Sequence, residues 1–139
     1  MKSTFPARIE EDSSGMFFVQ FLNFDEAITD GETLEEALFN AQEVLTLTIE
    51  SRLEEKVEIP FPQEIEGENI YHVAPDARVQ AALLVHQARG NRSIAELARA
   101  LGTSWPAAKR LEDPRHSPTL KILDKAAATL GKKLVLSFE

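Results

Sequence analysis

The spacing of the apolar residues changes at Thr33, and this change restricts the folds open to the first half of the chain. Before Thr33, apolar and polar side chains alternate over residues 3–11 and 16–22, which predicts two half-buried strands, and a short third strand is expected over 27–29. After Thr33, apolar residues recur every three or four positions as far as Leu53. This spacing predicts one long amphipathic helix that covers one face of a small antiparallel sheet.

The start and the end of this helix are also marked in the sequence. Thr33 and Glu36 form a capping-box pattern, in which the Thr33 hydroxyl accepts from the Glu36 amide and the Glu36 carboxylate reaches back to the Thr33 amide. Pro60 and Pro62 exclude a helix from the acidic stretch 54–68. A fourth strand is expected over 69–73. The order strand, strand, strand, helix, strand places residues 1–74 in the α+β class.

The second half has the pattern of an all-α domain, and we place the domain boundary between 1–74 and 75–139. Helices are expected at 75–89, from Ser93 to Gly102, from Thr103 or Ser104 to Leu111, and over 119–130. After Gly131, residues 132–139 alternate again, which predicts a terminal strand with Leu134, Leu136 and Phe138 on one side.

Charge is unequally divided between the two halves. Residues 1–74 hold four Lys and Arg against 17 Asp and Glu, a net charge of −13, whereas residues 75–139 hold 11 against six, a net charge of +5. A basic surface attracts phosphate, and an acidic surface repels it and attracts basic partners. The division therefore indicates nucleic-acid binding by the second half and a basic protein partner for the first.

The segment 93–112 has the features of a helix-turn-helix. Ala98 is the small residue where two helices cross, and Gly102 is a turn residue able to take positive φ. The second helix would enter the major groove, with Lys109 and Arg110 near guanine edges or phosphates. Trp105 fits either a nucleic-acid contact or helix packing. The predicted DNA-binding residues are Arg92, Ser93, Thr103, Ser104, Trp105, Lys109, Arg110 and Arg115.

The predicted terminal strand needs a partner strand, because unpaired backbone groups at a strand edge promote aggregation. Pairing with the same strand of a second chain across a two-fold axis would satisfy Leu134, Leu136 and Phe138 as dimerisation residues. Such a homodimer would place two recognition helices about 34 Å apart on a palindromic operator. The alternative is that the strand joins the N-terminal sheet, and the choice between a dimer and a tetramer stays open.

Several segments resemble the HicB family, the antitoxins of HicA–HicB toxin–antitoxin modules. In the first half the resemblance rests on residues 5–7, 15–19 and above all 27–38, and in the second half on 97–102 and 118–134. It implies a truncated ribonuclease H-like sheet, a partner HicA that is a small basic mRNA-cleaving ribonuclease, and repression of the module's own operon. With that partner, the acidic residues near the strand ends become the expected toxin contacts: Glu10, Glu11, Asp12, Asp25, Glu26, Asp30 and Glu32.

Other functions are less well supported by the sequence. The carboxylates lie mostly on expected loops and a helix cap, and the three histidines fall on different elements, so we expect no enzyme activity, no metal site and no cofactor. No apolar signal-peptide core is present near the N-terminus and there is no cysteine, which favours the cytoplasm. The alternative function is a helix-turn-helix repressor whose N-terminal half senses a small molecule.

Overall fold

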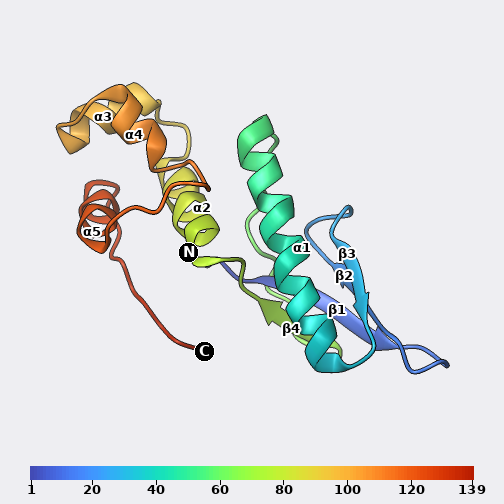
Figure 1. Cartoon of the computed structure of the whole chain (residues 1–139). Helices are drawn as coiled ribbons and strands as arrows, with labels where there is room; N and C mark the ends of the chain where they lie inside the picture. Colours follow the sequence, from blue (N-terminus) through green and yellow to red (C-terminus); the bar gives the residue numbers. More distant parts are fainter.

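The computed structural model describes residues 1–139, and its elements follow the predicted order (Figure 1). The predicted α+β class is confirmed. None of the helices is both long enough and apolar enough to cross a membrane. The strands are β1 Phe5–Glu11, β2 Phe17–Phe21, β3 Ile28–Gly31 and β4 Ile70–Val73, and the helices are α1 Leu34–Glu55, α2 Ala77–Arg89, α3 Ile94–Leu101, α4 Trp105–Arg110 and α5 Leu120–Thr129.

The four strands form one antiparallel sheet in the order β3-β2-β1-β4. In the central row, Ile9 of β1 lies opposite Val19 of β2, which in turn lies opposite Thr29 of β3. Ile9 and Val19 are buried, as the alternation in the sequence predicts for the face that packs against a helix. Alternate residues of the same strands, such as Phe18, lie on the opposite face, which α1 does not cover.

Helix α1 covers the sheet and begins where the sequence predicts. The Glu36 amide donates to the Thr33 hydroxyl at 3.1 Å, but the reciprocal bond of the predicted capping box is not formed. The helix continues to Glu55 and ends at Lys56, which takes a left-handed conformation with φ 58°. Its first turn lies against β3 so closely that a Cβ on Gly31 would stand 2.4 Å from the Ala37 nitrogen. Only glycine fits there without a backbone shift.

Helix α2 lies on the side of α1 away from the sheet and belongs to both hydrophobic cores (Figure 1). Its Val79 and Leu83 pack into the cluster built on the sheet and α1, whereas its Val85 packs into the cluster of the C-terminal helices. The helix starts at Ala77, two residues later than expected, and the Asp76 amide donates to the Thr46 hydroxyl of α1 at 2.9 Å. The domain boundary at residue 74 stays a prediction.

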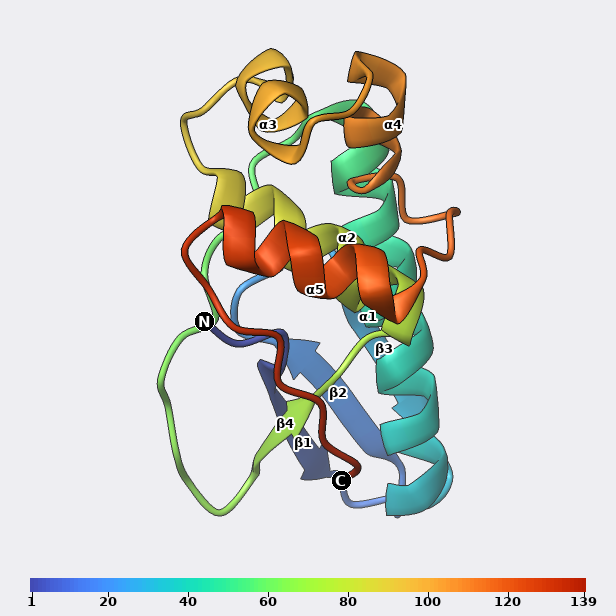
Figure 2. The same ribbon diagram turned by 90° about the vertical axis from the view of Figure 1, so that its left-hand side faces the viewer.

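The predicted strand over 132–139 is wrong for the single chain. These residues leave α5 as an extended tail with a free end, and they form no backbone ladder (Figure 2). The alternative that they join the N-terminal sheet is not seen either, because the sheet has only four strands. A strand exists only when its N–H and C=O groups have a partner, and the tail pairs with neither edge strand of the sheet. Pairing with a second chain stays a prediction.

Candidate functional site

Helices α3 and α4 are joined by a tight turn of the kind the sequence predicts. Gly102 has φ 68° and ψ 37°, and the Thr103 amide donates to the Ala98 carbonyl at 3.0 Å, which closes α3. The Ser104 hydroxyl then accepts from the Ala107 amide and begins α4, so Ser104 and not Thr103 is the cap. Pro106 lies in the first turn of α4, where a missing amide hydrogen leaves no bond unmade.

Small residues let the two helices approach each other. Ala98 of α3 and Ala108 of α4 are both buried, and Ala108 is fully enclosed. Leu97, Leu101 and Leu111 complete the apolar contact beneath them. This packing fixes the angle of α4 and turns its other side to solvent.

Four of the eight predicted DNA-binding residues lie together on the outer side of this segment. Thr103, Trp105, Lys109 and Arg110 are exposed, and the Lys109 ammonium lies 5.9 Å from the centroid of the Trp105 ring. Trp105 is 51% exposed, so it does not serve as a helix-packing residue in this chain. The side chains available here are two cations and one aromatic ring, a combination suited to phosphate and base contacts.

Three of the other predicted residues have intramolecular roles. The Ser93 hydroxyl accepts from the Glu96 amide and caps α3, and the Ser104 hydroxyl caps α4. The Arg92 guanidinium donates to the backbone carbonyl of Ala88 at 3.1 Å and to that of Arg89 at 3.4 Å. Because Arg92 is exposed, these bonds orient it without enclosing it.

Arg115, the eighth predicted DNA-binding residue, is bound to helix α1. Its guanidinium lies 2.7 Å from the Glu54 carboxylate and 3.3 Å from the Glu50 carboxylate. The hydrogen bond to Glu54 raises the pKa of Arg115, and the charge of Glu50 adds to this effect. A groove of about 570 Å³ runs between the end of α1 and α4, and its lining includes Lys109 and Arg110. Acidic side chains of the first half thus stand beside the predicted DNA-binding face.

A second ion pair connects α2 to the end of α4. The Glu112 carboxylate accepts from the Arg89 guanidinium at 2.5 and 2.9 Å, and the His86 Nδ1 atom lies 2.7 Å away. Burial by itself would raise the pKa of Glu112, but the hydrogen bonds with His86 and Arg89 outweigh burial and lower it. No sequence spacing signals this contact, because the partners are 23 and 26 residues apart.

The predicted toxin-binding residues fall into two groups at opposite ends of the strands. Glu10, Asp30 and their neighbours lie at one end, where Glu10 and Asp30 flank Phe18 in a single cross-strand row. In the turn that follows β1, the Asp12 carboxylate accepts from the Ser14 hydroxyl and from the Ser14 and Met16 amides, which lowers its pKa. This first group consists of Glu10, Glu11, Asp12, Asp30 and Glu32, all of them exposed.

The second group, Asp25 and Glu26, lies in the loop between β2 and β3. The Glu26 carboxylate accepts two hydrogen bonds from the Arg52 guanidinium, at 2.8 and 2.9 Å, and these bonds lower its pKa. The Arg52 guanidinium also stands 4.9 Å over the Phe24 ring. Glu26 is therefore already paired with a cation, whereas Asp25 is exposed and takes part in no ion pair.

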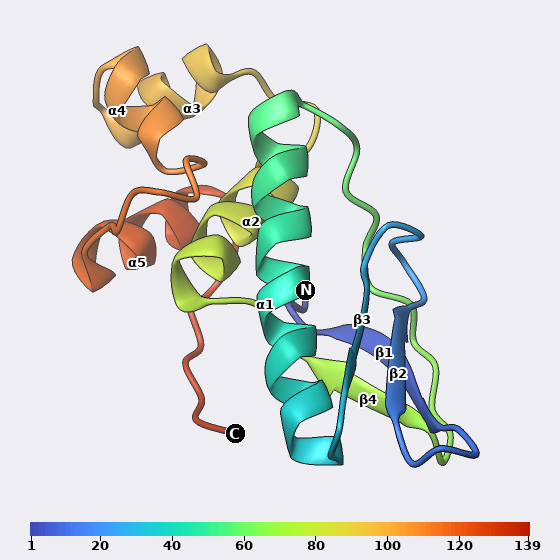
Figure 3. The same cartoon turned by 45° about the vertical axis from the view of Figure 1, so that its right-hand side comes forward.

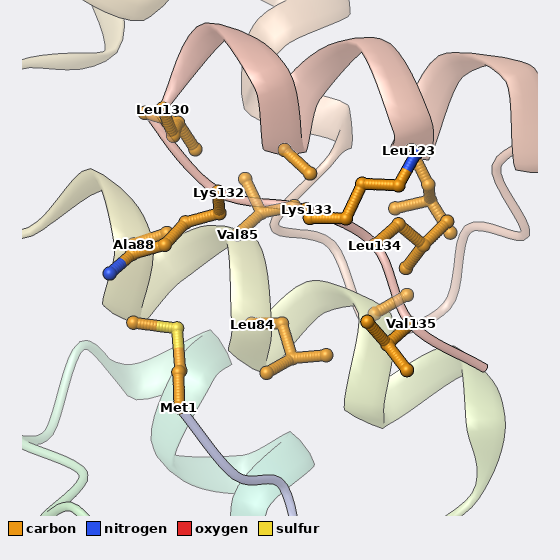
Figure 4. Close-up of a pocket in the computed structure, with 12 residues that line it drawn as sticks. Met1, Leu84, Val85, Ala88, Leu123, Leu130, Lys132, Lys133, Leu134 and Val135 are labelled. Atoms are coloured by element: carbon orange, nitrogen blue, oxygen red, sulfur yellow. The ribbon is translucent and has the colours of Figure 1, made fainter. Parts of the chain in front are cut away.

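An apolar cavity of about 310 Å³ lies in the C-terminal half (Figure 4). Helix α2 supplies Leu84, Val85 and Ala88, helix α5 supplies Leu123, and the tail closes the cavity with Leu134 and Val135. Because the tail forms one wall, the shape of this cavity depends on where residues 132–139 lie. No pattern in the sequence predicts this cavity.

The amino-acid sequence is similar to a family profile and to several known proteins. The sequence profile of a family described as the HicB-like antitoxin of bacterial toxin–antitoxin systems matches residues 4–75. "Antitoxin HicB 2" of Photorhabdus laumondii is 35% identical over 132 residues, 95% of this chain and 94% of the relative. "Antitoxin HicB" of Escherichia coli K12 is 27% identical over 133 residues, 95% of this chain and 96% of the relative. The alternative of a small-molecule sensor in the N-terminal half is not favoured, since these relatives are antitoxins and all the residues that line the apolar cavity except Met1 belong to the other half.

Proposed function

This chain belongs to the HicB family of bacterial antitoxins, and from that premise we propose that it neutralises a HicA-type mRNA-cleaving ribonuclease and represses its own operon. The observation that carries the proposal is the likeness to antitoxins over nearly the whole chain, from the acidic sheet to the basic helices. Both tasks take place in the cytoplasm, and neither requires catalysis, a metal or a cofactor from this chain.

Neutralisation follows from the charge of the first half. A ribonuclease must attract RNA phosphate, so a HicA-type toxin presents a basic active face, and the N-terminal charge of −13 draws it in. The carboxylates at the turn end of the sheet are exposed to it, namely Glu10, Glu11, Asp12, Asp30 and Glu32. Binding there would mask the toxin's active face and exclude RNA.

Repression is assigned to the outer side of α4. Lys109 and Arg110 are exposed and reach bases or phosphates of the DNA. Trp105 packs on the DNA backbone, and Thr103 lies just before the N-terminal cap of α4. Arg92 and Arg115 flank this face, and Arg115 exchanges its carboxylate partners for phosphate when DNA arrives. The Ser93 and Ser104 hydroxyls stay bonded to the backbone amides that they cap. These two residues therefore lie near the DNA at the starts of α3 and α4.

A two-fold dimer would supply two such faces for a palindromic operator. Residues 132–139 are unpaired in the single chain, and Val135, Leu136 and Phe138 are 80%, 66% and 108% exposed. Pairing of two tails as antiparallel strands would gather Leu134, Leu136 and Phe138 of both chains on one face and satisfy the backbone groups. The dimer, or a tetramer made of two dimers, is the binding form in this proposal.

The division of labour is tested with single substitutions in the full-length chain. Lys109→Ala and Arg110→Ala should each weaken operator binding by about 1–3 kcal/mol if these side chains read bases. Neutralisation of a co-expressed toxin should stay intact in both variants. Gel retardation measures the first property, and growth rescue measures the second. Loss of neutralisation together with normal operator binding would contradict the assignment.

The dimer is tested by removing the tail. Deletion of residues 133–139 should convert a dimer into a monomer in analytical ultracentrifugation, because the proposed strand pair is lost. Operator affinity should fall with it, since one recognition helix then binds alone. A dimer that survives the deletion would show that other surfaces hold the two chains together.

A further inference from the structure

One face of the sheet carries exposed apolar side chains. Helix α1 covers the face that holds Ala7, Ile9, Val19 and Phe21, all buried. On the opposite face Phe18 is 47% exposed. Ile28 of the neighbouring edge strand is 58% exposed on that same face, because it lies opposite Gln20, two residues after Phe18.

The strand register places carboxylates around this apolar pair. Phe18 lies opposite Glu10 of β1 on one side and opposite Asp30 of β3 on the other. Ile28 is two residues from Asp30 on the same strand, so it is the diagonal neighbour of Phe18. The one cation nearby, Arg8, lies 3.7 Å from the Glu10 carboxylate and is balanced by it. The patch is therefore apolar at its centre and acidic at its rim.

Another segment of the chain contacts part of the sheet on this side. The connection from α1 to β4 passes on the side of the sheet away from α1 (Figure 3). Its Glu66 carboxylate lies 3.3 Å from the His72 ring of β4, and Asn23 donates to the Phe61 carbonyl. The connection thus contacts β4 and the loop after β2, and it leaves Phe18 and Ile28 exposed to a partner.

We propose that Phe18 and Ile28 are the apolar anchor of the toxin-binding surface, with Glu10 and Asp30 as its charged rim. The inference rests on the proposed antitoxin function and specifies the face used. Interfaces place most of their binding energy in a few central aromatic and apolar side chains, while charges at the rim set encounter rate and orientation. A basic protein matches the rim, because the charges beside Phe18 are two carboxylates, Glu10 and Asp30, against the single cation Arg8.

The test measures the affinity of the full-length chain for the HicA toxin of its own module by isothermal titration calorimetry. Phe18→Ser should weaken binding by about 30-fold or more, and Ile28→Ser by about 10-fold. Phe39→Ser and Leu47→Ser are the matched controls, since these side chains of α1 are 61% and 63% exposed and lie outside the sheet face. The controls should bind as the wild type does, and circular dichroism should show all four variants folded.

A second variant tests the rim without changing the apolar centre. Glu10→Lys combined with Asp30→Lys should slow association at low salt, and the difference should shrink as salt is raised. If the wild type binds the toxin and Phe18→Ser binds equally well, the proposed anchor is wrong while the antitoxin function stands. If the wild type itself does not bind, the proposed function fails and the anchor with it. A Phe18→Ser chain with a changed sedimentation coefficient would assign the face to self-association and overturn the proposal.

Discussion

The two halves of the molecule differ in how completely they bury their own apolar residues. The sheet and α1, with the first part of α2, enclose a cluster of 15 buried residues that includes Phe5, Phe21 and Phe24. The C-terminal helices enclose a cluster of eight, three of which are alanines. A larger cluster of larger side chains removes more apolar surface from water, so the first half contributes more of the free energy of folding.

The same comparison shows where each half needs a partner. In the first half, exposed apolar residues lie on one sheet face, on the outer side of α1, in the connection after α1 and at Met1, within a strongly acidic half of the chain. In the second half, α5 exposes Leu120 and Ile122, and the tail exposes Val135, Leu136 and Phe138. An apolar surface of this kind is typical of a self-association site, whereas an acidic rim is typical of binding to a basic protein.

The largest expected effect on the free energy of unfolding comes from truncating one buried leucine in each hydrophobic cluster. Leu45→Ala in α1 should lower the free energy of unfolding by about 3–5 kcal/mol, and Leu97→Ala in α3 by about 2–3 kcal/mol, because the smaller cluster collapses more easily onto the gap. Both leucines are buried, and Leu47, which is 63% exposed, provides the control. Urea denaturation followed by circular dichroism gives the values. Equal losses in the free energy of unfolding at the two sites would show that the two hydrophobic clusters do not differ in their response to truncation.

The next effect concerns the ion pair that holds the C-terminal half together. Glu112→Gln should lower the free energy of unfolding by about 2–3 kcal/mol, because the side chain is 8% exposed and its hydrogen bonds with Arg89 and His86 lose their charge. The folded-state pKa of Glu112 lies below the ordinary value of 4.5, so its contribution is complete above that pH and is lost as the pH falls through the folded-state pKa.

The pH dependence separates this pair from general acid unfolding. Wild type and Glu112→Gln should differ most near neutral pH and converge in thermal unfolding curves measured below the ordinary glutamate pKa. Glu96→Gln is the control, because Glu96 is exposed and takes part in none of the ion pairs. A constant difference between wild type and Glu112→Gln down to pH values well below 4 would exclude the carboxylate as its source.

The smallest expected effect tests the contact between the halves. Glu54→Gln removes one of the two carboxylates bound to Arg115 and should tighten operator binding about two- to five-fold, because phosphate then meets less competing negative charge. Glu55→Gln is the matched control, an exposed neighbour that does not contact Arg115. Fluorescence anisotropy at fixed salt measures the difference. Weaker binding by Glu54→Gln would mean that the contact positions Arg115 for DNA and does not compete with it.

Much of the molecule is determined by the sequence through short-range interactions. Alternation fixes which residues of β1 and β2 face α1, and the predicted caps Thr33 and Ser93 begin their helices. Ser104, one of two candidates, begins α4. Gly102 ends α3 in a left-handed conformation. These features depend on residues within about four positions of one another, so they can be read from spacing alone.

The tertiary structure decided the features that join distant segments. It bound Arg115 to Glu50 and Glu54, paired Glu112 with Arg89, and left residues 132–139 without a strand partner. It also laid the connection between α1 and β4 across one side of the sheet and left Phe18 and Ile28 uncovered on the other. Such contacts depend on the distance between segments once the cores have packed, and no local pattern in the sequence specifies that distance.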